Sequence, residues 1–332
     1  MKTLVTGATG FIGKHLVKRL VEEGRTVICL VRKTSNVDEL KKLKVEIIYG
    51  DLLDYTLLND ILIDTEIGII YHLGGAVYSR KSKNYREVNI LGTKNLLEAC
   101  CDRNRIKKFI LVSSITAVGP QRQRQYILNE DTLPNPIPPY GMSKYESEKI
   151  ALKYSKDYNL PLVIVRPPLV YGPEQSLDMT NIFKKIEKGL FRIIGDGEFI
   201  TSLCYIDNLI DGLLLIEKNN NSIGQIYFIA DNKYYTFKEI AETISKEMDV
   251  NLPNVKIPKW FGNLSGLLYQ VLHKFFGVTS ITLYSLKLMT LNFACDISKI
   301  RRELSYKPAV DLEEGIRRTV KWYKAEFANH GS

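Results

Sequence analysis

Tyr140 and Lys144 stand four residues apart in the motif YGMSK. On a helix this spacing places both side chains on one face. A free tyrosine, with a pKa of about 10, is a poor base at neutral pH, but a nearby lysine cation favours the phenolate and lowers that pKa. Pro138 and Pro139 fix the start of the helix at Tyr140, so the positive end of the helix dipole acts in the same direction. The pair therefore predicts proton exchange with the oxygen of a secondary alcohol or ketone during hydride transfer.

A glycine motif, TGATGFIG, lies directly between an apolar run, Lys2–Val5, and a helical pattern, Phe11–Glu23. Gly7 permits a tight turn, Gly10 lets the backbone approach a pyrophosphate, and Gly13 lets the helix pack on the strand. The free N–H groups and the positive end of the helix would then face the phosphates. The motif in this context predicts dinucleotide binding.

The first 170 residues alternate short apolar runs with amphipathic stretches. Strands are predicted at Lys2–Val5, Thr26–Val31, Val45–Tyr49, Ile67–Leu73, Lys108–Ser113 and Leu162–Arg166, and the clearest later helices at Val88–Cys101 and Lys144–Tyr158. Continuous apolar strands that alternate with helices are typical of a parallel sheet covered on both faces. The predicted fold class is α/β, a Rossmann-type doubly wound parallel sheet.

The pattern loosens after Pro167. One more strand, Gln225–Ala230, and two helices, Phe237–Met248 and Glu313–Phe327, are predicted there, with a strongly apolar segment at residues 260–276. We expect a dinucleotide-binding domain over residues 1–173, with segments of about residues 200–230 returning to its sheet. Residues 174–330 are expected to form a smaller α/β domain that mainly binds substrate.

Composition excludes several classes of protein. The 332 residues are 45% apolar and 25% charged, as in soluble globular proteins, and the five scattered cysteines fit reduced thiols in the cytoplasm better than a disulfide framework. No metal-ligand spacing and no membrane-spanning apolar stretch is present, so we predict neither a metal site nor a transmembrane helix. The net charge of +9 is spread along the chain, which favours a solvated basic surface and an anionic cofactor over a nucleic-acid or membrane partner.

The glycine spacing after Thr6, together with the Tyr–Lys pair, resembles the extended branch of the short-chain dehydrogenase/reductase superfamily, which includes NAD-dependent epimerases and dehydratases. The resemblance covers nearly the whole chain. It includes the motifs GDL at residues 50–52, HLGG at 72–75 and RPPLVYGP at 166–173. It implies an enzyme whose dinucleotide contacts Gly7, Thr9, Gly10, Phe11, Ile12, Gly13, Arg32, Lys33, Asp51, Leu52, Leu73, Gly74, Gly75, Asn89, Val112, Tyr140, Lys144, Pro167 and Val170.

The resemblance also implies roles for polar side chains. Counted back from Gly119, as in the family, Ser114 is the serine that hydrogen-bonds the substrate oxygen, with Ser113 as the fallback. The family's lysine also binds the nicotinamide ribose, and its aspartate after the third strand accepts from the adenine amino group. Tentative substrate contacts are Val77, Tyr78, Ser114, Thr116 and Tyr171.

The end of the second strand decides between the two nicotinamide dinucleotides. An NAD enzyme places an acid there to hold the ribose 2′-hydroxyl. Here the position is Val31, and two cations, Arg32 and Lys33, follow it. An arginine can bind a 2′-phosphate through two hydrogen bonds. NADP(H) is therefore favoured, and NAD(H) stays open.

Two substrate classes compete. Nucleotide-sugar enzymes of the family usually carry an arginine for the diphosphate where this chain has Thr201, and the motif YIDN at residues 205–208 resembles the steroid-type branch. We therefore expect an apolar ketone or alcohol, of the kind that 3β-hydroxysteroid dehydrogenases and dihydroflavonol reductases use. The alternative is a nucleotide-sugar 4-epimerase or dehydratase with tightly bound NAD, in which a cation such as Arg192 replaces the missing anchor.

Three further expectations concern regulation and partners. A noncatalytic NADP-sensing regulator is a minor alternative, because such proteins tend to lose the Tyr–Lys pair. A homodimer is expected by analogy with the family. The apolar segment 260–276 suits a hydrophobic substrate, a peripheral membrane contact or a buried core helix.

Overall fold

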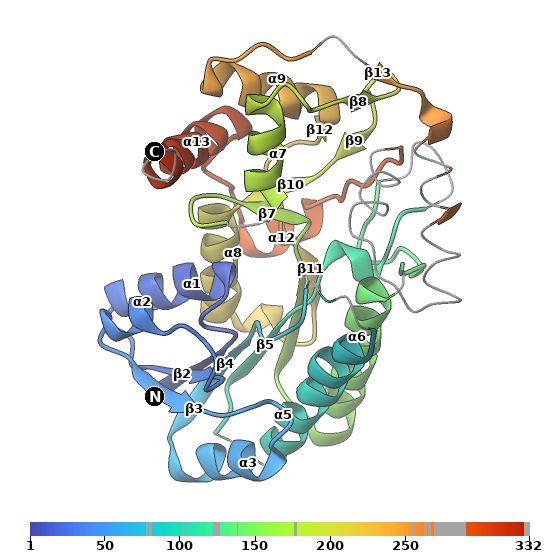
Figure 1. Ribbon diagram of the computed structural model, residues 1–332. Helices are drawn as coiled ribbons and strands as arrows, with labels where there is room; N and C mark the ends of the chain where they lie inside the picture. The colour runs from blue at the N-terminus through green and yellow to red at the C-terminus, as the bar shows by residue number, and fades with distance from the viewer. Residues whose placement is uncertain are drawn as a thin grey trace.

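The computed structural model describes residues 1–77, 79, 82–101, 103, 105–121, 127–137, 139–175, 178–253, 256–261, 264, 267–268 and 290–328. Its centre is a seven-stranded sheet in the order β11-β6-β5-β4-β1-β2-β3, with every neighbouring pair parallel (Figure 1). The strands are β1 (Lys2–Thr6), β2 (Val27–Val31), β3 (Glu46–Tyr49), β4 (Ile67–His72), β5 (Lys108–Val112), β6 (Leu162–Arg166) and β11 (Ile226–Phe228). This order is typical of dinucleotide-binding sheets, and the predicted fold class is confirmed.

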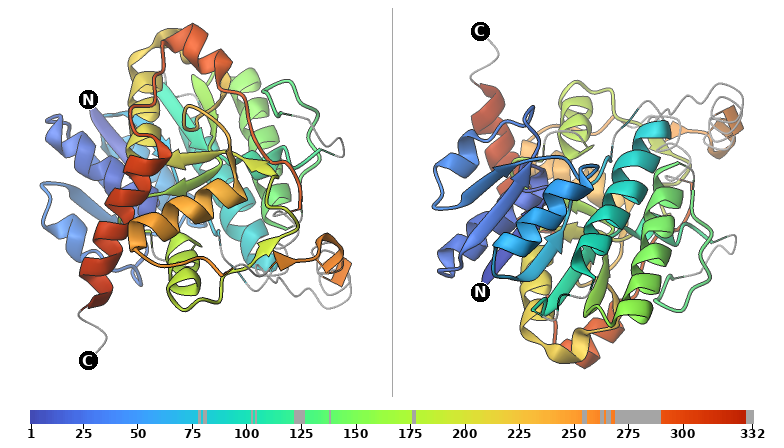
Figure 2. Two further views of the ribbon diagram at one scale, coloured as in Figure 1. Left: turned by 90° about the horizontal axis from the view of Figure 1, so that it is seen from above. Right: turned by 90° about the horizontal axis from the view of Figure 1, so that it is seen from below.

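Helices cover both faces of the sheet (Figures 1 and 2). One face carries α3 (Tyr55–Asp64), α5 (Gly92–Cys100) and α6 (Tyr140–Tyr158), and the other carries α1 (Phe11–Glu22) and α8 (Ile206–Lys218). Strand side chains alternate between the faces. Leu4 therefore lies in a core cluster with Leu58 of α3, whereas Val5 lies in the opposite cluster with Leu16 of α1 and Leu213 of α8.

The direction of the connections reverses between β1 and β4, which lie side by side in the sheet. Their register pairs Thr6 with His72 at the carboxyl ends. The chain leaves β1 toward one face and leaves β4 toward the other. In doubly wound folds the ligand crevice opens at this reversal point.

Two predicted helices differ from the structure at their starts. The helix expected at Val88–Cys101 begins earlier, as α4 (Ser82–Asn84), and continues through a π-helix (Tyr85–Leu91) into α5. The Tyr–Lys helix starts at Tyr140, with Pro139 as its N-cap residue, whereas Pro138 lies outside the described residues. Tyr140 and Lys144 therefore share the first turns of one helix.

The C-terminal part lies beyond the carboxyl ends of the strands, because β7 (Leu169–Tyr171) follows β6 after only two prolines. Its elements are α7 (Asp178–Glu187), β8 (Ile193–Ile194), β9 (Ile200–Thr201), β10 (Leu203–Tyr205), β12 (Tyr235–Thr236), α9 (Phe237–Met248), β13 (Lys256–Ile257), α12 (Ser298–Leu304) and α13 (Leu312–Ala328). Three short strand pairs, β7 with β10, β8 with β13 and β9 with β12, link them. The domain boundary at residue 173 stays a prediction.

A buried lysine connects the sheet to α8. Lys108, the first residue of β5, is 1% exposed, and its Nζ donates to the carbonyl oxygens of Ile216, Glu217 and Asn219 at 2.7, 2.9 and 2.7 Å. These carbonyls lie at the C-terminal end of α8, where no further helical turn supplies donors. The lysine therefore caps α8 and holds it against the sheet.

The apolar segment 260–276 is only partly described. Trp260, Phe261, Leu264, Leu267 and Leu268 are all exposed, so a buried core helix is not what these five residues form. Within the described ranges, no helix is both long and apolar enough to cross a bilayer.

Candidate active site

The glycine motif forms a cradle at the end of β1. Gly7 has a φ of +71°, and a Cβ there would stand 2.7 Å from the carbonyl carbon of Leu73. A Cβ on Gly13 would stand 2.1 Å from the Gly7 carbonyl oxygen, so only glycine lets α1 pack this closely. Gly10 is the N-cap of α1 and has no side chain to accept from the first turn. The N–H groups of this turn are therefore available to a pyrophosphate, and the cradle fits a dinucleotide.

The remaining residues of the motif line the start of α1. Thr9 is half-buried in the turn, and Phe11 and Ile12 are the first two residues of the helix. Both are half-buried and pack against the larger core cluster. The structure thus brings all six predicted residues of the motif to one turn.

The opposite wall of the cradle follows β4. The Gly74 N–H donates to Thr6 Oγ1 at 3.0 Å, and Thr6 Oγ1 lies 2.7 Å from His72 Nδ1. His72 Nε2 lies 2.9 Å from Thr93 Oγ1, whose hydroxyl donates to the Asn89 carbonyl. With the His72 proton on Nε2, Nδ1 accepts from the Thr6 hydroxyl and Nε2 donates to Thr93 Oγ1, so each group in this chain has a matching partner. Complete burial lowers the pKa of His72 to about 3, so this imidazole stays neutral and joins the two strand ends.

Asn89 connects this wall to the Tyr–Lys helix. Its Oδ1 accepts from the Ala76 N–H at 2.6 Å, and its Nδ2 donates to Ser143 Oγ at 2.8 Å. The Ser143 hydroxyl donates to the Tyr140 carbonyl at 2.7 Å. A chain of side chains therefore runs from the glycine cradle to the first turn of α6. Sequence reasoning placed Asn89 at the site but missed its partner Ser143.

Lys144 is buried in the crevice. Its Nζ donates to the Val112 carbonyl at the end of β5, at 2.9 Å. A Cβ on Gly75 would stand 3.5 Å from Nζ and 3.1 Å from Asn89 Oδ1, so glycine keeps the space beside the amine open. Burial lowers the pKa of Lys144 to about 8, and the nearby Glu148 carboxylate opposes this shift. At neutral pH the amine therefore keeps most of its charge.

Glu148 is itself held in place one turn further along α6. Arg166 at the end of β6 binds it through Nε at 3.0 Å and through Nη2 at 2.7 Å, and both side chains are buried. A buried pair of this geometry holds α6 at a defined position on the sheet. The next residue, Pro167, accepts through its carbonyl from the Ile115 N–H at 2.9 Å.

Ser114 and Thr116 lie against the first turn of α6. Ser114 caps a short 3₁₀ helix (Ile115–Ala117), and its Oγ accepts from the Thr116 hydroxyl at 2.9 Å. Gly141 touches this turn so closely that a Cβ would stand 2.4 Å from the Thr116 carbonyl oxygen. The Oγ of Ser113, the fallback residue, is buried and has no hydrogen-bond partner within the described part of the chain. Tyr140, Ser114 and Thr116 are thus brought together.

Tyr85 is a site residue that sequence reasoning missed. Its ring centroid lies 6.0 Å from that of Tyr140, and its hydroxyl donates to the Val77 carbonyl at 3.0 Å. Val77 is 47% exposed and free to contact a substrate. Tyr78, the next predicted contact, lies outside the described residues. No sequence pattern indicates that Tyr85, which lies on the π-helix, contacts Tyr140.

The ends of β2 and β3 carry the residues that are expected to contact the adenosine half of the dinucleotide. Val31 is buried, whereas Arg32 and Lys33 are exposed in the turn that follows. Asp51 is also exposed, and its carboxylate accepts from the Leu53 N–H at 2.9 Å. Leu52 covers the neighbouring glycine loop, because a Cβ on Gly74 would stand 2.8 Å from its Cδ1.

Neither Val170, a predicted dinucleotide contact, nor Tyr171, a tentative substrate contact, is exposed. Val170 is buried, and Tyr171 is 0% exposed, with its hydroxyl 3.3 Å from Asp231 Oδ2. Gly315 of α13 lies directly over this ring, since a Cβ there would stand 2.5 Å from the tyrosine hydroxyl oxygen. The expectation that Tyr171 contacts substrate is therefore not supported, because α13 covers it.

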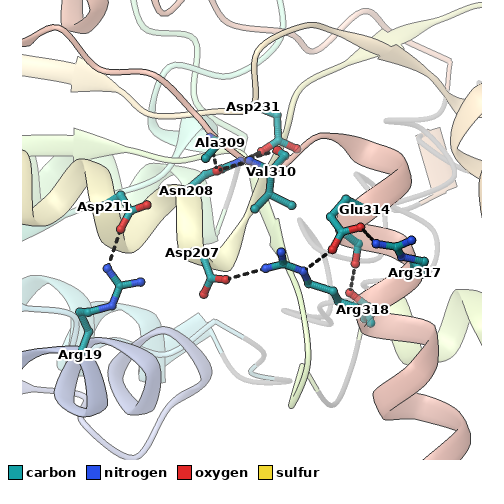
Figure 3. Close-up of polar contacts among 12 residues, drawn as sticks. Arg19, Asp207, Asn208, Asp211, Asp231, Ala309, Val310, Glu314, Arg317 and Arg318 are labelled. Atoms are coloured by element: carbon teal, nitrogen blue, oxygen red, sulfur yellow. Dashed lines mark hydrogen bonds and ion pairs between the residues drawn. The ribbon is translucent and has the colours of Figure 1, made fainter. Parts of the chain in front are cut away.

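The motif YIDN anchors the C-terminal segment (Figure 3). Asn208 Nδ2 donates to Asp231 Oδ1 at 2.7 Å, and Asn208 Oδ1 accepts from the N–H groups of Ala309 and Val310 at 3.0 Å. Asp207 pairs with Arg318 of α13 at 3.3 Å. These contacts give Asp207 and Asn208 a structural role in holding the C-terminal segment.

Thr201 and Arg192, the two positions considered for binding a substrate diphosphate, both hydrogen-bond to backbone carbonyls of this chain. The Thr201 hydroxyl donates to the Phe293 carbonyl at 3.3 Å. Arg192 Nη1 donates to the carbonyls of Gly189 and Phe191 at 2.6 and 2.8 Å, just after α7. No cluster of His, Cys, Asp or Glu in the described residues has the arrangement of a metal site.

The strand order and the glycine cradle are those of a dinucleotide-dependent oxidoreductase. Residues 3–230 match the model of the NAD dependent epimerase/dehydratase family, and the chain belongs to that family. The resemblance to extended short-chain dehydrogenases is thereby confirmed. The relatives are epimerases, dehydratases and dehydrogenases, and this chain is an enzyme.

Several known proteins match over nearly their whole length. UDP-glucose 4-epimerase of Vibrio cholerae is 27% identical, with 96% of this chain and 94% of the relative covered. The 4-hydroxy-2-methyl-3-oxo-4-farnesyl-3,4-dihydroquinoline-1-oxide ketoreductase of Stigmatella aurantiaca is 24% identical, with 95% of each chain covered. The crystal structure of UDP-glucuronic acid 4-epimerase from Bacillus cereus with UDP-glucuronic acid and NAD has a TM-score of 0.78 and 28% identity, covering 98% of this chain and 100% of that one.

Proposed function

We propose that this enzyme is a nucleotide-sugar epimerase or dehydratase that oxidises a sugar hydroxyl by hydride transfer. The observation that carries the chemistry is the buried Lys144 amine, which lies beside Gly75 at the carboxyl edge of the sheet, on the helix that Tyr140 begins. The similarity to two sugar 4-epimerases supports the substrate class. This class is the alternative of the sequence-based expectation, and the comparisons favour it over a steroid-like substrate.

The chain's own residues divide the work. Tyr140 takes the proton of the sugar hydroxyl and returns it after the keto stage, with the Lys144 cation favouring its phenolate form. Ser114 donates a hydrogen bond to the same substrate oxygen, and Thr116 holds the Ser114 oxygen in place. The first turn of α1 binds the pyrophosphate, and Lys144 and Asn89 lie where the nicotinamide half is expected. When bound, the nicotinamide ring accepts and returns the hydride.

Two observations support different dinucleotides. Val31 followed by the exposed cations Arg32 and Lys33 supports NADP(H), because a 2′-phosphate gains charge-assisted hydrogen bonds there. The similar solved structure contains NAD, which supports NAD and fits an epimerase that keeps its cofactor through each turnover. Binding constants for both dinucleotides decide between them.

A second candidate function is reduction of an apolar ketone. The Thr201 hydroxyl stands where a diphosphate-binding arginine is expected, and it already bonds to the Phe293 carbonyl. The similarity to the farnesylated-quinoline ketoreductase points in the same direction. Such an enzyme would consume reduced dinucleotide, whereas an epimerase would not.

This difference makes a direct test. The purified enzyme is incubated with UDP-glucose, UDP-N-acetylglucosamine and UDP-glucuronic acid, and products are separated while dinucleotide absorbance is followed. The proposal predicts conversion of at least one sugar nucleotide with no net change in dinucleotide absorbance. Oxidation of NADPH in step with reduction of an added steroid or flavonoid ketone, without activity on any sugar nucleotide, would overturn it.

We further propose a homodimer and a cytoplasmic location. Leu91 on the π-helix and Met142 and Leu152 on the outer face of α6 are large apolar side chains that stay exposed. A second copy that packs on this face would cover them. The free cysteines, of which Cys29, Cys100, Cys204 and Cys295 are buried, support a reducing compartment. Sedimentation velocity would show a dimer in the wild type and a monomer in Leu152→Glu.

A further inference from the structure

Three charged side chains are buried together at the candidate site. Lys144 and Glu148 stand four residues apart on α6, so both lie on the same face of this helix. Arg166 is the last residue of β6, and the three residues are 7, 1 and 4% exposed. Charged side chains are almost never fully buried unless they are paired. Their burial in one place therefore points to an interaction between their charges.

The carboxylate of Glu148 is held in a fixed place by Arg166. Arg166 Nε donates to Glu148 Oε1 at 3.0 Å, and Nη2 donates to Oε2 at 2.7 Å. The guanidinium also lies 5.8 Å from the centre of the Phe228 ring on β11. Two such hydrogen bonds fix the orientation of both groups and stabilise the carboxylate in its charged form. A buried negative charge is thereby kept one helical turn beyond Lys144.

The Lys144 amine has a place set by the backbone and a charge set by its surroundings. Its Nζ donates to the Val112 carbonyl at 2.9 Å. Burial lowers the pKa of Lys144 to about 8, and the Glu148 carboxylate opposes this effect by raising it. Because burial alone would lower the pKa further, loss of the carboxylate would leave the amine mostly neutral near pH 7.5.

The other titratable groups around Lys144 do not supply a negative charge. His72 faces it from β4, but complete burial lowers the pKa of His72 to about 3, so the imidazole is neutral. Arg166 approaches from β6, and its charge is positive. Tyr140 precedes Lys144 on α6 and is the residue whose proton the reaction moves. Among the residues that the structure describes here, Glu148 is therefore the source of the negative charge.

We propose that Glu148 is a positioning residue for the reaction, and that its Arg166-bound carboxylate keeps the Lys144 amine charged in the crevice. A charged Lys144 favours the phenolate of Tyr140, which takes the proton of the substrate hydroxyl. Glu148 is 1% exposed, so it acts through Lys144 and not by touching the substrate. The role of Lys144 in turnover rests on the proposed function, whereas its charge can be measured without a substrate.

The test measures the protonation of Lys144 directly. The enzyme as purified, labelled with [ε-¹³C]lysine, is titrated by NMR, and Lys144→Met identifies the Lys144 signal. Glu148→Gln removes the charge and keeps the size of the side chain. The midpoint of Lys144 should fall by about one pH unit, from about 8 in the wild type. Arg166→Met breaks the same ion pair but leaves the carboxylate, so the midpoint should not fall.

Two further variants separate charge from packing. Glu146→Gln also removes a carboxylate from α6, but Glu146 is partly exposed and pairs with Lys149 at 2.7 Å, so the Lys144 midpoint should not change. In Glu148→Met/Arg166→Met both charges of the pair are gone. This variant leaves no unpaired buried charge, and it serves if a single variant does not fold. Its Lys144 midpoint should also be lower than that of the wild type.

The same change should appear in the pH dependence of turnover. If the pKa of Lys144 falls from about 8 to about 7, its charged fraction at pH 7.5 falls about threefold. Turnover of the sugar nucleotide by Glu148→Gln should fall by the same factor at this pH. At pH 6 the amine is charged in both enzymes, so their turnover should be nearly equal. The NMR titration decides the inference even for an enzyme that converts no sugar nucleotide.

Three results would overturn the proposal. One is a Lys144 midpoint in Glu148→Gln that equals that of the wild type. Another is an equal fall of the midpoint in Glu148→Gln and Arg166→Met, which would mean that the ion pair only holds α6 in place. The third is a loss of turnover in Glu148→Gln that is the same at pH 6 and pH 7.5, because a change in the charge of Lys144 must depend on pH.

Discussion

Gly141 provides a sharp test of how the candidate site is assembled. It is the second residue of α6 and lies against the 3₁₀ helix that Ser114 caps. In Gly141→Ala the new Cβ would stand 2.4 Å from the Thr116 carbonyl oxygen. Because that oxygen belongs to the backbone, no side-chain rotation relieves the contact. The two elements must separate by about 1 Å to restore a normal carbon–oxygen distance.

This separation falls between the groups that must act on one substrate oxygen. Tyr140 moves with α6, whereas Ser114 stays with Thr116, to which it is bound at 2.9 and 3.2 Å. A misplacement of about 1 Å costs roughly 10²-fold in rate. Alanine is also the better helix former by about 1 kcal/mol, which offsets part of the strain. We therefore expect kcat to fall about 100-fold while the protein stays folded.

The assay compares kcat and dinucleotide affinity in Gly141→Ala and in Met142→Ala. Met142 is the next residue along the helix and is 44% exposed, so its truncation should leave kcat unchanged. Dinucleotide affinity should change little in either variant, because the glycine cradle is not moved. A folded Gly141→Ala enzyme with wild-type kcat would refute the assembly of the site described above.

Other residues make separate predictions. Arg32→Ala should weaken NADPH binding about 10- to 100-fold and leave NADH binding unchanged, because only NADPH has a 2′-phosphate to lose; equal dissociation constants before and after would show a merely solvated loop. Lys108→Met should lower the free energy of unfolding, measured in urea, by about 2 kcal/mol, because the Glu217 carbonyl loses its donor, whereas the carbonyls of Ile216 and Asn219 keep the Ser222 hydroxyl. Burial raises the pKa of Asp231 from 3.8 to about 7, so the folded state holds a proton that the unfolded state has released. The free energy of unfolding should therefore fall as pH rises from 3.8 to about 7. Asp231→Asn should make it less dependent on pH, which unfolding curves at several pH values would show.

Local sequence patterns were enough to predict the strands of the sheet, the glycine motif and the Tyr140–Lys144 pair. Strand periodicity and the glycine motif are set by neighbours in the sequence, which is why β1 and α1 agree with expectation. The two prolines indicate the start of α6 at Tyr140, although its periodic pattern indicates a helix only from Lys144. The strand order then follows from the general rules of doubly wound folds. The same reasoning correctly placed Lys144 in the crevice beside Val112.

Contacts between distant segments were beyond the reach of the sequence. His72 binds Thr6 and Thr93, 66 and 21 residues away, so its role depends on the sheet register. Tyr171 is the last residue of β7, but Gly315 of α13, which is distant in the sequence, packs against its ring. The exposure of Trp260, Phe261 and Leu264 could likewise not be predicted from hydrophobicity alone, since apolar helices occur both in cores and at interfaces.

Tyr140→Phe tests the central claim most directly, because it removes one hydroxyl and keeps the ring that faces Tyr85. Turnover of the sugar nucleotide should fall by about 10²–10⁴-fold, the usual contribution of a positioned acid–base group. Dinucleotide affinity should stay close to that of the wild type. A Tyr140→Phe enzyme that turns over at nearly the wild-type rate would contradict the assignment of Tyr140 as the acid–base residue.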